Sequence, residues 1–254
     1  MENKKSKKVS LILTTFNCKD NLKKTLASIE DQDYPNVEVV IKDGGSEDGT
    51  LDIILEYQKA SKYQVKWVSK PDKGIFDAMN QGYRLTTGDV LLFFNDVFTT
   101  PNVISKMISK IETINPTTGE EYVGAHADLV YADGDKIIRK WHMGEGNIKD
   151  GWMPGHPTLF LKREIYEKYG LYDPSFKIGA DYEFMIRILK DKKNQLAYIP
   201  EVMVLMFYGG TSSGGLKNYI ESFKEGHRAL KINGVKGALV IDIKRTVNVL
   251  KQFI

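Results

Sequence analysis

The sequence predicts an α/β protein with a mainly parallel central sheet, and three observations lead to this class. Four short apolar runs rich in β-branched residues occur within the first hundred residues, and polar turn residues bound each run. Between the runs lie segments whose apolar residues recur at helical spacing. Strands that alternate with helices in this way build right-handed βαβ units, whose strands pair in parallel. The predicted strands are Val9 to Leu13, Val37 to Ile41, Val65 to Val68 and Val90 to Phe94.

The three helices between these strands each carry one apolar stripe. A stripe that repeats every three to four residues predicts a helix with one face packed on the sheet. The stripes are Leu22, Leu26 and Ile29; Ile53, Ile54 and Tyr57; and Ala78, Met79, Gly82 and Leu85.

Beyond residue 100 the alternation is less regular. The stretch "ADLVYADGDKIIRKWH" predicts a hairpin with Gly134 near its turn, and "GHPTLFLKREIYEKYG" predicts a short strand followed by a helix. A further helix is predicted in "GADYEFMIRILKDK". The stretch "LAYIPEVMVLMFYGG" predicts two strands separated at Pro200, because proline cannot donate a ladder hydrogen bond.

Composition and charge limit the class of protein. The chain has 254 residues, 42% of them hydrophobic, and its net charge of +3 is too small to indicate a nucleic-acid surface. Its one cysteine, Cys18, cannot form an internal disulfide and suits a reducing compartment. No signal peptide is visible, and the longest apolar stretch, Val202 to Tyr208, is far shorter than the roughly 20 residues of a membrane span. We therefore expect a cytoplasmic protein that is either soluble or peripheral at the inner face of the cell membrane.

The last stretch, "LKINGVKGALVIDIKRTVNVLKQFI", mixes lysines with aliphatic residues at roughly helical spacing. Two interpretations of this stretch stay open. It is either a helix packed on the core or a basic amphipathic surface that rests on anionic lipid.

Polar or acidic groups follow all four predicted strands of the first hundred residues. Loops are polar anyway, but four such ends on one edge of a sheet indicate a site. Ligands of parallel sheets bind outside the carboxyl ends of the strands, so we expect these groups to line a cleft. The four segments are "TTFN", "KDGGSEDGT", "SKPDKG" and the pair Asn95 and Asp96.

Turn and capping chemistry explains some of the polar residues in and after the second and third segments, but not all of them. Ser46 or Asp48 can cap the following helix, but capping leaves Asp43 unexplained. Asp72 can cap the next helix in the same way. Asn80 lies inside that helix, where asparagine is unfavourable unless its amide has a partner.

Six blocks in this order resemble the family-2 glycosyltransferases of the GT-A fold, most of all the bacterial branch that builds capsular and other surface polysaccharides. The resemblance covers roughly residues 8 to 213. Its strength lies in the order of the blocks rather than in any one of them. The blocks are "VSLILTTFN", "VVIKDGGSEDGTLDII", "KPDKGIFDAMNQG", "TGDVLLFFND", "GHPTLF" and "GADYEFMIRIL".

The resemblance implies a role for each matching residue. Asp181 matches the general base, which a weakly nucleophilic sugar hydroxyl requires. His156 matches a position near the acceptor or the diphosphate. The residues implied to bind the nucleotide are Thr14, Phe16, Asn17, Asp43, Asp72 and Lys73, and those at the donor sugar are Asn80, Gly82 and Asn95.

The fourth strand end departs from the family pattern. Relatives have a D-x-D motif there, whose carboxylates bind Mg²⁺ or Mn²⁺ that bridges the diphosphate. This chain has Asp96 followed by Val97, so the resemblance implies a Mn²⁺ or Mg²⁺ site with Asp96 as its ligand and without the second carboxylate. His227 or basic residues could compensate.

Two further features suit such an enzyme. The glycine-rich stretch Tyr208 to Gly215 is either a mobile loop that closes over substrate or a plain surface loop. Trp141 and Trp152 could stack on sugars, although large aromatic residues more often belong to a core.

The resemblance implies an inverting transferase that moves a hexosyl or N-acetylhexosaminyl group from a UDP-sugar to a hydroxyl of a growing, lipid-linked polysaccharide. We expect one catalytic domain over 1–226, with a nucleotide-binding half at 8–98, an acceptor-binding half at 99–213 and a helical tail at 227–254. The alternative is a catalytically impaired nucleotide-sugar-binding protein. A dinucleotide-dependent oxidoreductase is disfavoured, because no G-x-G-x-x-G follows the first strand.

Overall fold

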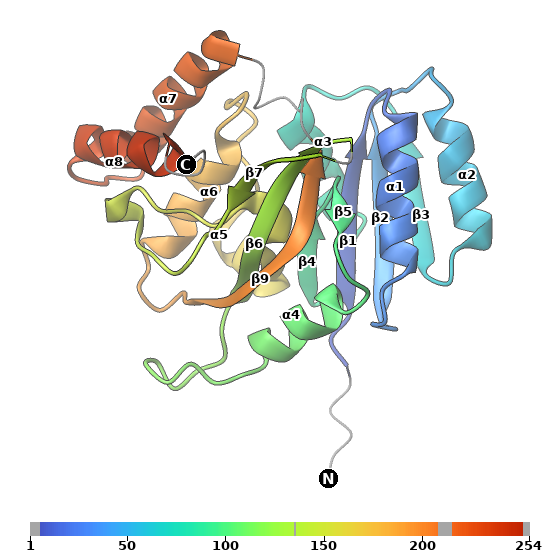
Figure 1. Cartoon of the computed structure of the whole chain (residues 1–254), viewed down its shortest axis with the longest axis horizontal. Coiled ribbons are helices and arrows are strands. Elements are labelled where there is room, and N and C mark those ends of the chain that lie inside the picture. Colours follow the sequence, from blue (N-terminus) through green and yellow to red (C-terminus); the bar gives the residue numbers. More distant parts are fainter. Residues whose placement is uncertain (1–5, 135, 208–214, 251–254) are drawn as a thin grey trace.

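The structure is a computed structural model that describes residues 6–134, 136–207 and 215–250. Its centre is one nine-stranded sheet (Figure 1). The strands are β1 (Val9–Thr15), β2 (Val37–Asp43), β3 (Gln64–Ser69), β4 (Val90–Phe93), β5 (Val97–Phe98), β6 (Gly124–Asp133), β7 (Lys136–Trp141), β8 (Phe160–Lys162) and β9 (Leu196–Phe207). They lie in the order β3-β2-β1-β4-β8-β6-β9-β5, and β7 pairs with β6 outside this path.

Helices alternate with the strands in the first half of the chain, and the last two helices follow the last strand. They are α1 (Lys19–Glu30), α2 (Thr50–Ala60), α3 (Ile75–Tyr83), α4 (Val103–Ile111), α5 (Arg163–Tyr169), α6 (Ala180–Leu189), α7 (Gly215–Ile232) and α8 (Ala238–Leu250). Two short 3-10 helices, η1 (Ile148–Asp150) and η2 (His156–Thr158), lie between β7 and β8.

The four strands predicted in the first hundred residues are confirmed, and all three of their pairings are parallel. Val9 of β1 lies opposite Val37 of β2 on one side and Val90 of β4 on the other. All four carboxyl ends therefore lie at the same edge of the sheet. The helix prediction holds for α1, α2 and α3, although Leu85 lies beyond the end of α3 and is exposed.

The second half of the sheet is mixed. β8 is antiparallel to β4 and β6, whereas β9 is parallel to β6. The predicted hairpin is confirmed as β6 and β7. The prediction that Pro200 separates two strands is wrong, because β9 is continuous. Its register against β6 shifts next to the proline, from Ile199 opposite Ala127 to Val202 opposite Asp128, so Pro200 stands in a bulge that needs no ladder bond.

The sheet separates two hydrophobic cores. One contains buried residues of α1, α2 and α4, and the other contains those of α3, α5, α6, α7 and α8. Alternate residues of β1 point into different cores, with Leu11 and Leu13 on one side and Ile12 on the other. A strand covered on both faces is apolar throughout, which explains why the central strands read as continuous apolar runs.

The C-terminal helices cover the end of the molecule opposite α2 (Figure 1). α7 packs against α6 and α8, and it runs through the boundary expected between residues 226 and 227. Among the described residues, no helix combines the length and the apolar character that crossing a bilayer requires.

Glu38 of β2 is the buried centre of a polar network beneath the opposite edge of the sheet. Its carboxylate accepts hydrogen bonds from the Ser10 hydroxyl and the Gly88 amide, and it pairs with Lys8 and Lys66 at 2.9 Å. Burial alone would raise the pKa of Glu38, but these partners lower it to about 2. The charged carboxylate therefore stabilises the fold at neutral pH.

We expect Glu38→Gln to lower the free energy of unfolding at pH 7 by about 3 kcal/mol, because it leaves buried donors and charges unpaired. The folded-state pKa lies below the ordinary value of 4.5, so this stabilisation is complete above that pH and is lost as the pH falls towards 2. Urea denaturation at several pH values measures it, with the exposed Glu56→Gln as control. Equal stability of Glu38→Gln and the wild type at pH 7 would contradict this role.

Candidate active site

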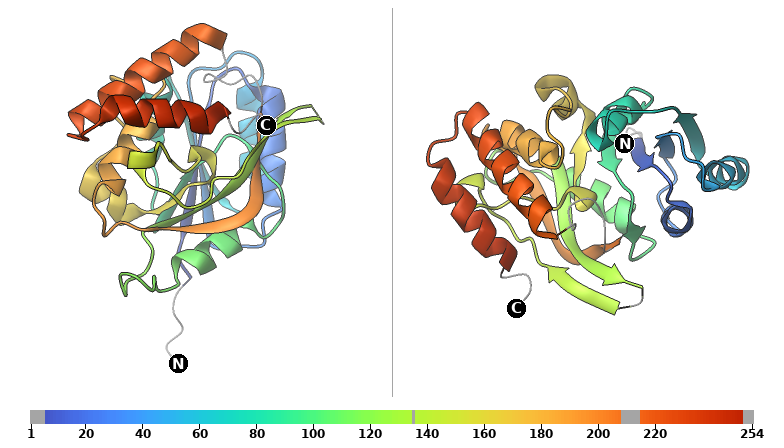
Figure 2. Two further views of the ribbon diagram at one scale, coloured as in Figure 1. Left: turned by 60° about the vertical axis from the view of Figure 1, so that its left-hand side comes forward. Right: turned by 90° about the horizontal axis from the view of Figure 1, so that it is seen from above.

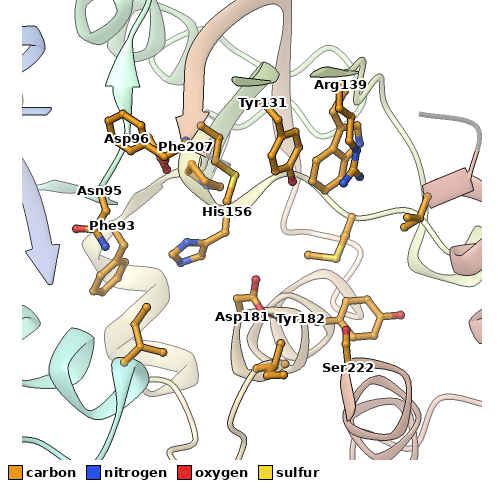
Figure 3. Close-up of a pocket in the computed structure, with 18 of the residues that line it drawn as sticks. Phe93, Asn95, Asp96, Tyr131, Arg139, His156, Asp181, Tyr182, Phe207 and Ser222 are labelled. Atoms are coloured by element: carbon orange, nitrogen blue, oxygen red, sulfur yellow. Dashed lines mark hydrogen bonds between the residues drawn. The ribbon is translucent and has the colours of Figure 1, made fainter. Parts of the chain in front are cut away.

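A cleft of about 1340 Å³ opens at the carboxyl ends of β1 and β4 (Figure 3). Strand ends form one wall, and η2, α6, α7 and α8 contribute to the other. Six of the residues to which the family resemblance assigned a site role line it together: Thr14, Phe16, Asn95, Asp96, His156 and Asp181. Asp96 and Asp181 are thus 85 positions apart in the chain but share one cavity.

Thr14 and Asn95 hold the ends of two neighbouring strands together. The Thr14 amide donates to Asn95 Oδ1 at 2.9 Å, and Asn95 Nδ2 donates to Thr14 Oγ1 at the same distance. This reciprocal pair uses both ends of the amide, so the asparagine side chain has a fixed orientation at the cleft. It also fixes the position of the next residue, Asp96.

Asp96 is buried at the cleft wall between β4 and β9. Its Oδ1 accepts a hydrogen bond from the Phe207 amide at 3.2 Å. Burial raises the pKa of Asp96 to about 7, and the Phe207 amide lowers it less than burial raises it. A divalent cation at this carboxylate would favour its charged form.

The protein side chains of the cleft could hold a metal ion only if a bound phosphate group and water completed its coordination shell. Within the described ranges, no group of three or more His, Cys, Asp or Glu side chains could hold one. Mg²⁺ is commonly bound through one or two carboxylates and completes its shell with water and substrate phosphates. Asp96 suits that arrangement as the one carboxylate at the end of β4.

Asp43 lies beneath the cleft surface and organises the loop that follows β2. It is fully buried, and its two oxygens accept from the Thr15, Ser46 and Ser69 hydroxyls and from the amides of Gly45 and Ser46. Burial alone would raise the pKa of Asp43, but these hydrogen bonds lower it below its ordinary value. Its side chain is not part of the cleft lining.

The loop after β1 is tied to the loop after β2. Asn17, which adopts a left-handed backbone with φ of 45°, accepts from the Glu47 amide and donates its own amide to the Ser46 hydroxyl. Phe16 remains 62% exposed and packs over Gly44, where an added Cβ would lie 3.1 Å from the ring. The backbone of this loop pair thus carries an exposed aromatic ring at the rim of the cleft.

Asp72 is tied to Lys42, a buried lysine that the sequence did not single out. Lys42 Nζ lies 3.0 Å from Asp72 Oδ2 and donates to the carbonyls of Asp43 and Lys70. The other Asp72 oxygen accepts from the Gly74 amide at the start of α3. Lys73 is exposed, and neither Asp72 nor Lys73 lines the cleft.

Asn80 and Gly82 act inside the fold. Asn80 Nδ2 donates to the Tyr172 carbonyl at 2.8 Å and its Oδ1 accepts from the Tyr172 amide at 3.1 Å, which gives the helix asparagine its partner. Gly82 lies against β1, where a Cβ would come within 2.6 Å of Ile12. Both residues therefore position α3 on the sheet, and neither is part of the cleft lining.

Asp181 and His156 face each other across the inner part of the cleft (Figure 3). Asp181 lies in the first turn of α6, and its Oδ1 accepts from the Tyr182 amide at 2.8 Å. Burial raises the pKa of Asp181, and burial lowers that of His156. His156 Nε2 lies 2.8 Å from the Tyr172 hydroxyl, and its ring stacks on Phe93. A carboxylate with a raised pKa in a cleft is suited to accepting a proton.

Glu225 of α7 was not found from the sequence, yet it holds the backbone that leads into Asp181. Its carboxylate is buried and accepts from the amides of Lys177, Ile178 and Gly179 at 2.7, 2.8 and 2.8 Å. These amides precede α6, so Glu225 satisfies donors at the start of that helix. The sequence contains no local signal for this contact, because the acceptor lies 46 positions from Gly179.

Three further features were predicted from the sequence: the two tryptophans, His227 and the glycine-rich stretch. Trp141 and Trp152 both line the cleft, and Trp152 Nε1 donates to the Met143 carbonyl at 2.9 Å. His227 is not part of the cleft lining that contains Asp96. Its Nδ1 is bonded to Asp242 at 2.7 Å, so the suggestion that it completes a metal site is not supported. The proposed closing loop at 208–215 lies outside the described residues except for its last position.

The sequence matches a known family over most of its length. The profile of glycosyl transferase family 2 matches residues 10–178. An uncharacterised glycosyltransferase of Mycobacterium tuberculosis is 31% identical over 188 residues, which cover 70% of this chain and 68% of the relative.

Solved structures of glycosyltransferases have a similar fold. Staphylococcus aureus TarS, residues 1–349 in complex with UDP-GlcNAc, matches 96% of this chain and 73% of its own with a TM-score of 0.72 at 16% identity. The mannosyltransferase PcManGT of Pyrobaculum calidifontis, in complex with GDP-Man and Mn²⁺, matches 98% of this chain and 75% of its own with a TM-score of 0.65, also at 16% identity. The GT-A fold expected from the sequence is confirmed.

Proposed function

The chain belongs to glycosyl transferase family 2, and we propose that it transfers one sugar from a UDP-sugar to a hydroxyl of a lipid-linked glycan, with inversion at the anomeric carbon. The observation that carries this proposal is the single cleft shared by Asp96, at the end of β4, and Asp181, at the start of α6. A diphosphate held near the first carboxylate would place the attached sugar towards the second. This arrangement brings an acceptor hydroxyl within reach of a base.

The strand ends of residues 8–98 would bind the nucleotide, and residues 99–213 would bind the acceptor. The exposed ring of Phe16 offers a stacking surface for a base beside Thr14 and Asn17. The neighbour that binds UDP-GlcNAc supports a UDP-sugar with a hexosyl or N-acetylhexosaminyl group. Asp43, Asp72 and Lys42 would act below this surface by holding the loops in place.

Asp96 would hold Mn²⁺ or Mg²⁺ together with the donor diphosphate. The likeness to a structure with bound Mn²⁺ supports this part of the proposal. A bound cation would supply positive charge beside the leaving diphosphate. Asn95 would keep the Asp96 backbone in place through its bonds to Thr14.

Asp181 would take the proton of the acceptor hydroxyl. The acceptor oxygen forms its new bond to the anomeric carbon from the face opposite the diphosphate, while the bond from that carbon to the phosphate oxygen breaks. One displacement from the opposite face inverts the configuration. His156 would remain neutral at neutral pH, because burial lowers its pKa, and its contact with Tyr172 fixes its ring.

A second candidate is a nucleotide-sugar-binding protein without transferase activity. The observation that favours it is Val97, which follows Asp96 where the D-x-D pattern implied by the family resemblance would have a second carboxylate. Such a protein would bind the donor and would show no turnover with any acceptor.

A panel of nucleotide sugars with and without Mn²⁺ tests the proposal by thermal shift and by release of nucleoside diphosphate. We expect a UDP-sugar with Mn²⁺ to raise the melting temperature, since a ligand at 100 times its Kd stabilises a fold by about 2.7 kcal/mol. GDP-mannose and NAD are the controls. Stabilisation without turnover would favour the second candidate, and absence of stabilisation by every nucleotide sugar would refute both.

A further inference from the structure

Helix α8 presents a row of aliphatic side chains to solvent. They are Leu239, Val240, Ile243, Val247 and Leu250, with exposures between 43% and 60%. Their spacing of three to four residues places most of them on one side of the helix. The opposite side packs into the core through Ala238 and Ile241. A soluble surface rarely gathers aliphatic residues in this way without a binding role.

The segment that contains this helix is strongly basic. Residues 227–254 contain six lysine or arginine residues and one aspartate, whereas the whole chain has a net charge of only +3. The aspartate, Asp242, is fully buried and bonded to His227. Three exposed lysines belong to this segment: Lys231 at the end of α7, Lys236 in the turn before α8, and Lys244 on α8, which pairs with Asp150 at 2.8 Å. The apolar row of α8 is therefore flanked by cations at the end of α7 and in the turn between the two helices.

The position of α8 connects this surface to the cleft. α8 lies on the outside of the molecule beside α7, as two views show (Figure 2). Arg245, Thr246 and Val249 line the cleft, and so does Leu250 at the end of the aliphatic row. A surface that α8 contacts would therefore lie next to the cleft mouth.

We propose that α8 docks on an anionic lipid surface, with its aliphatic row in the interface and with Lys231 and Lys236, which precede the helix, at the headgroups. Docking would bring a lipid-linked acceptor to the cleft, and in this respect the inference rests on the proposed function. An apolar helix face with lysines next to it binds such a surface through both kinds of contact. A second copy of the chain fits less well, because pairing α8 with itself would bring the exposed lysines of both copies together.

Co-sedimentation with vesicles tests the docking. We expect the full chain to bind vesicles of phosphatidylcholine with about 30% phosphatidylserine, and to bind pure phosphatidylcholine more weakly. The double variant L239S/I243S should lose at least about tenfold in vesicle affinity, because it removes two buried aliphatic chains. Lys236→Glu should lose about fivefold or more, and only on the anionic vesicles.

The matched control is Ile137→Ser on β7, an equally exposed isoleucine outside the cleft lining, which should bind vesicles as the wild type does. Unchanged vesicle binding by L239S/I243S would overturn the proposal. So would a wild-type dimer in sedimentation velocity that this double variant dissociates, together with no vesicle binding. Donor turnover in solution is measured in parallel. Vesicle binding without turnover would count against the proposed function alone, and turnover without vesicle binding against the docking alone.

Discussion

Asp181→Asn should reduce the turnover of donor and acceptor by about 10²- to 10⁴-fold, the range that loss of a general base produces. The amide keeps the size of the side chain and can still accept from the Tyr182 amide, so the start of α6 should stay in place. Donor binding, measured by thermal shift, should remain as in the wild type. The steady-state rate with saturating donor measures the effect.

The acidity of Asp181 predicts the pH profile of the wild type. Burial raises the pKa of Asp181 above its ordinary value, and only the deprotonated form can accept the acceptor proton. Activity should therefore fall on acidification at a higher pH than an ordinary aspartate would give. The Asp181→Asn variant should lack this acidic limb.

Asp52→Asn provides the matched control, because Asp52 also lies in the first turn of a helix but is exposed on α2. Its turnover should equal that of the wild type. Full transfer activity in Asp181→Asn would remove the residue from its proposed role as base.

Glu225→Gln should lower the turnover number by about 10²-fold, which is the cost of a small displacement of a catalytic group. The glutamine carbonyl can replace only one of the two carboxylate oxygens, so its NH2 group would face either the Lys177 amide or the amides of Ile178 and Gly179, where an oxygen now accepts. The segment before α6 would move, and Asp181 would move with it. The variant should also lose about 2 kcal/mol of stability, because hydrogen bonds to a charged acceptor are lost.

Turnover and KM together separate positioning from general destabilisation. Measured at a temperature where the variant stays folded, the turnover number should fall while the KM for the donor changes little. Glu221→Gln, one turn earlier on α7, is the control and should behave as the wild type. A variant that loses stability but keeps its turnover number would show that Glu225 serves the fold alone.

The pattern of apolar residues predicted the first half of the fold well, because each strand and helix there has a regular set of apolar residues that packs in a core. β1 and β4 have apolar residues in both cores, β2 and β3 pack apolar residues on one of them, and α1 to α3 have one apolar stripe each. The second half was less readable, since β9 continues past Pro200 by means of a bulge against β6. A bulge depends on the partner strand, and a single-strand pattern contains no information about it.

The candidate site was predictable in part for the same reason. Strand ends identified Thr14, Asn95 and Asp96, and order along the chain pointed to Asp181. The sequence also singled out Asp43 and Asn80. It did not distinguish residues that line the cleft from residues that fix the position of the surrounding loops and helices. In the structure the side chains of Asp43 and Asn80 are hydrogen-bonded to other parts of the protein.

The sequence by itself determined which residues end the parallel strands, because alternation of apolar runs and helical stripes fixes the edge of the sheet at which those ends meet. Only the tertiary structure decided which polar groups face the cavity. That choice depends on partners far along the chain, such as Tyr172 for Asn80 at 92 positions and Glu225 for Gly179 at 46. A buried polar group must find such a partner to offset its loss of water, and only the folded chain brings the two together.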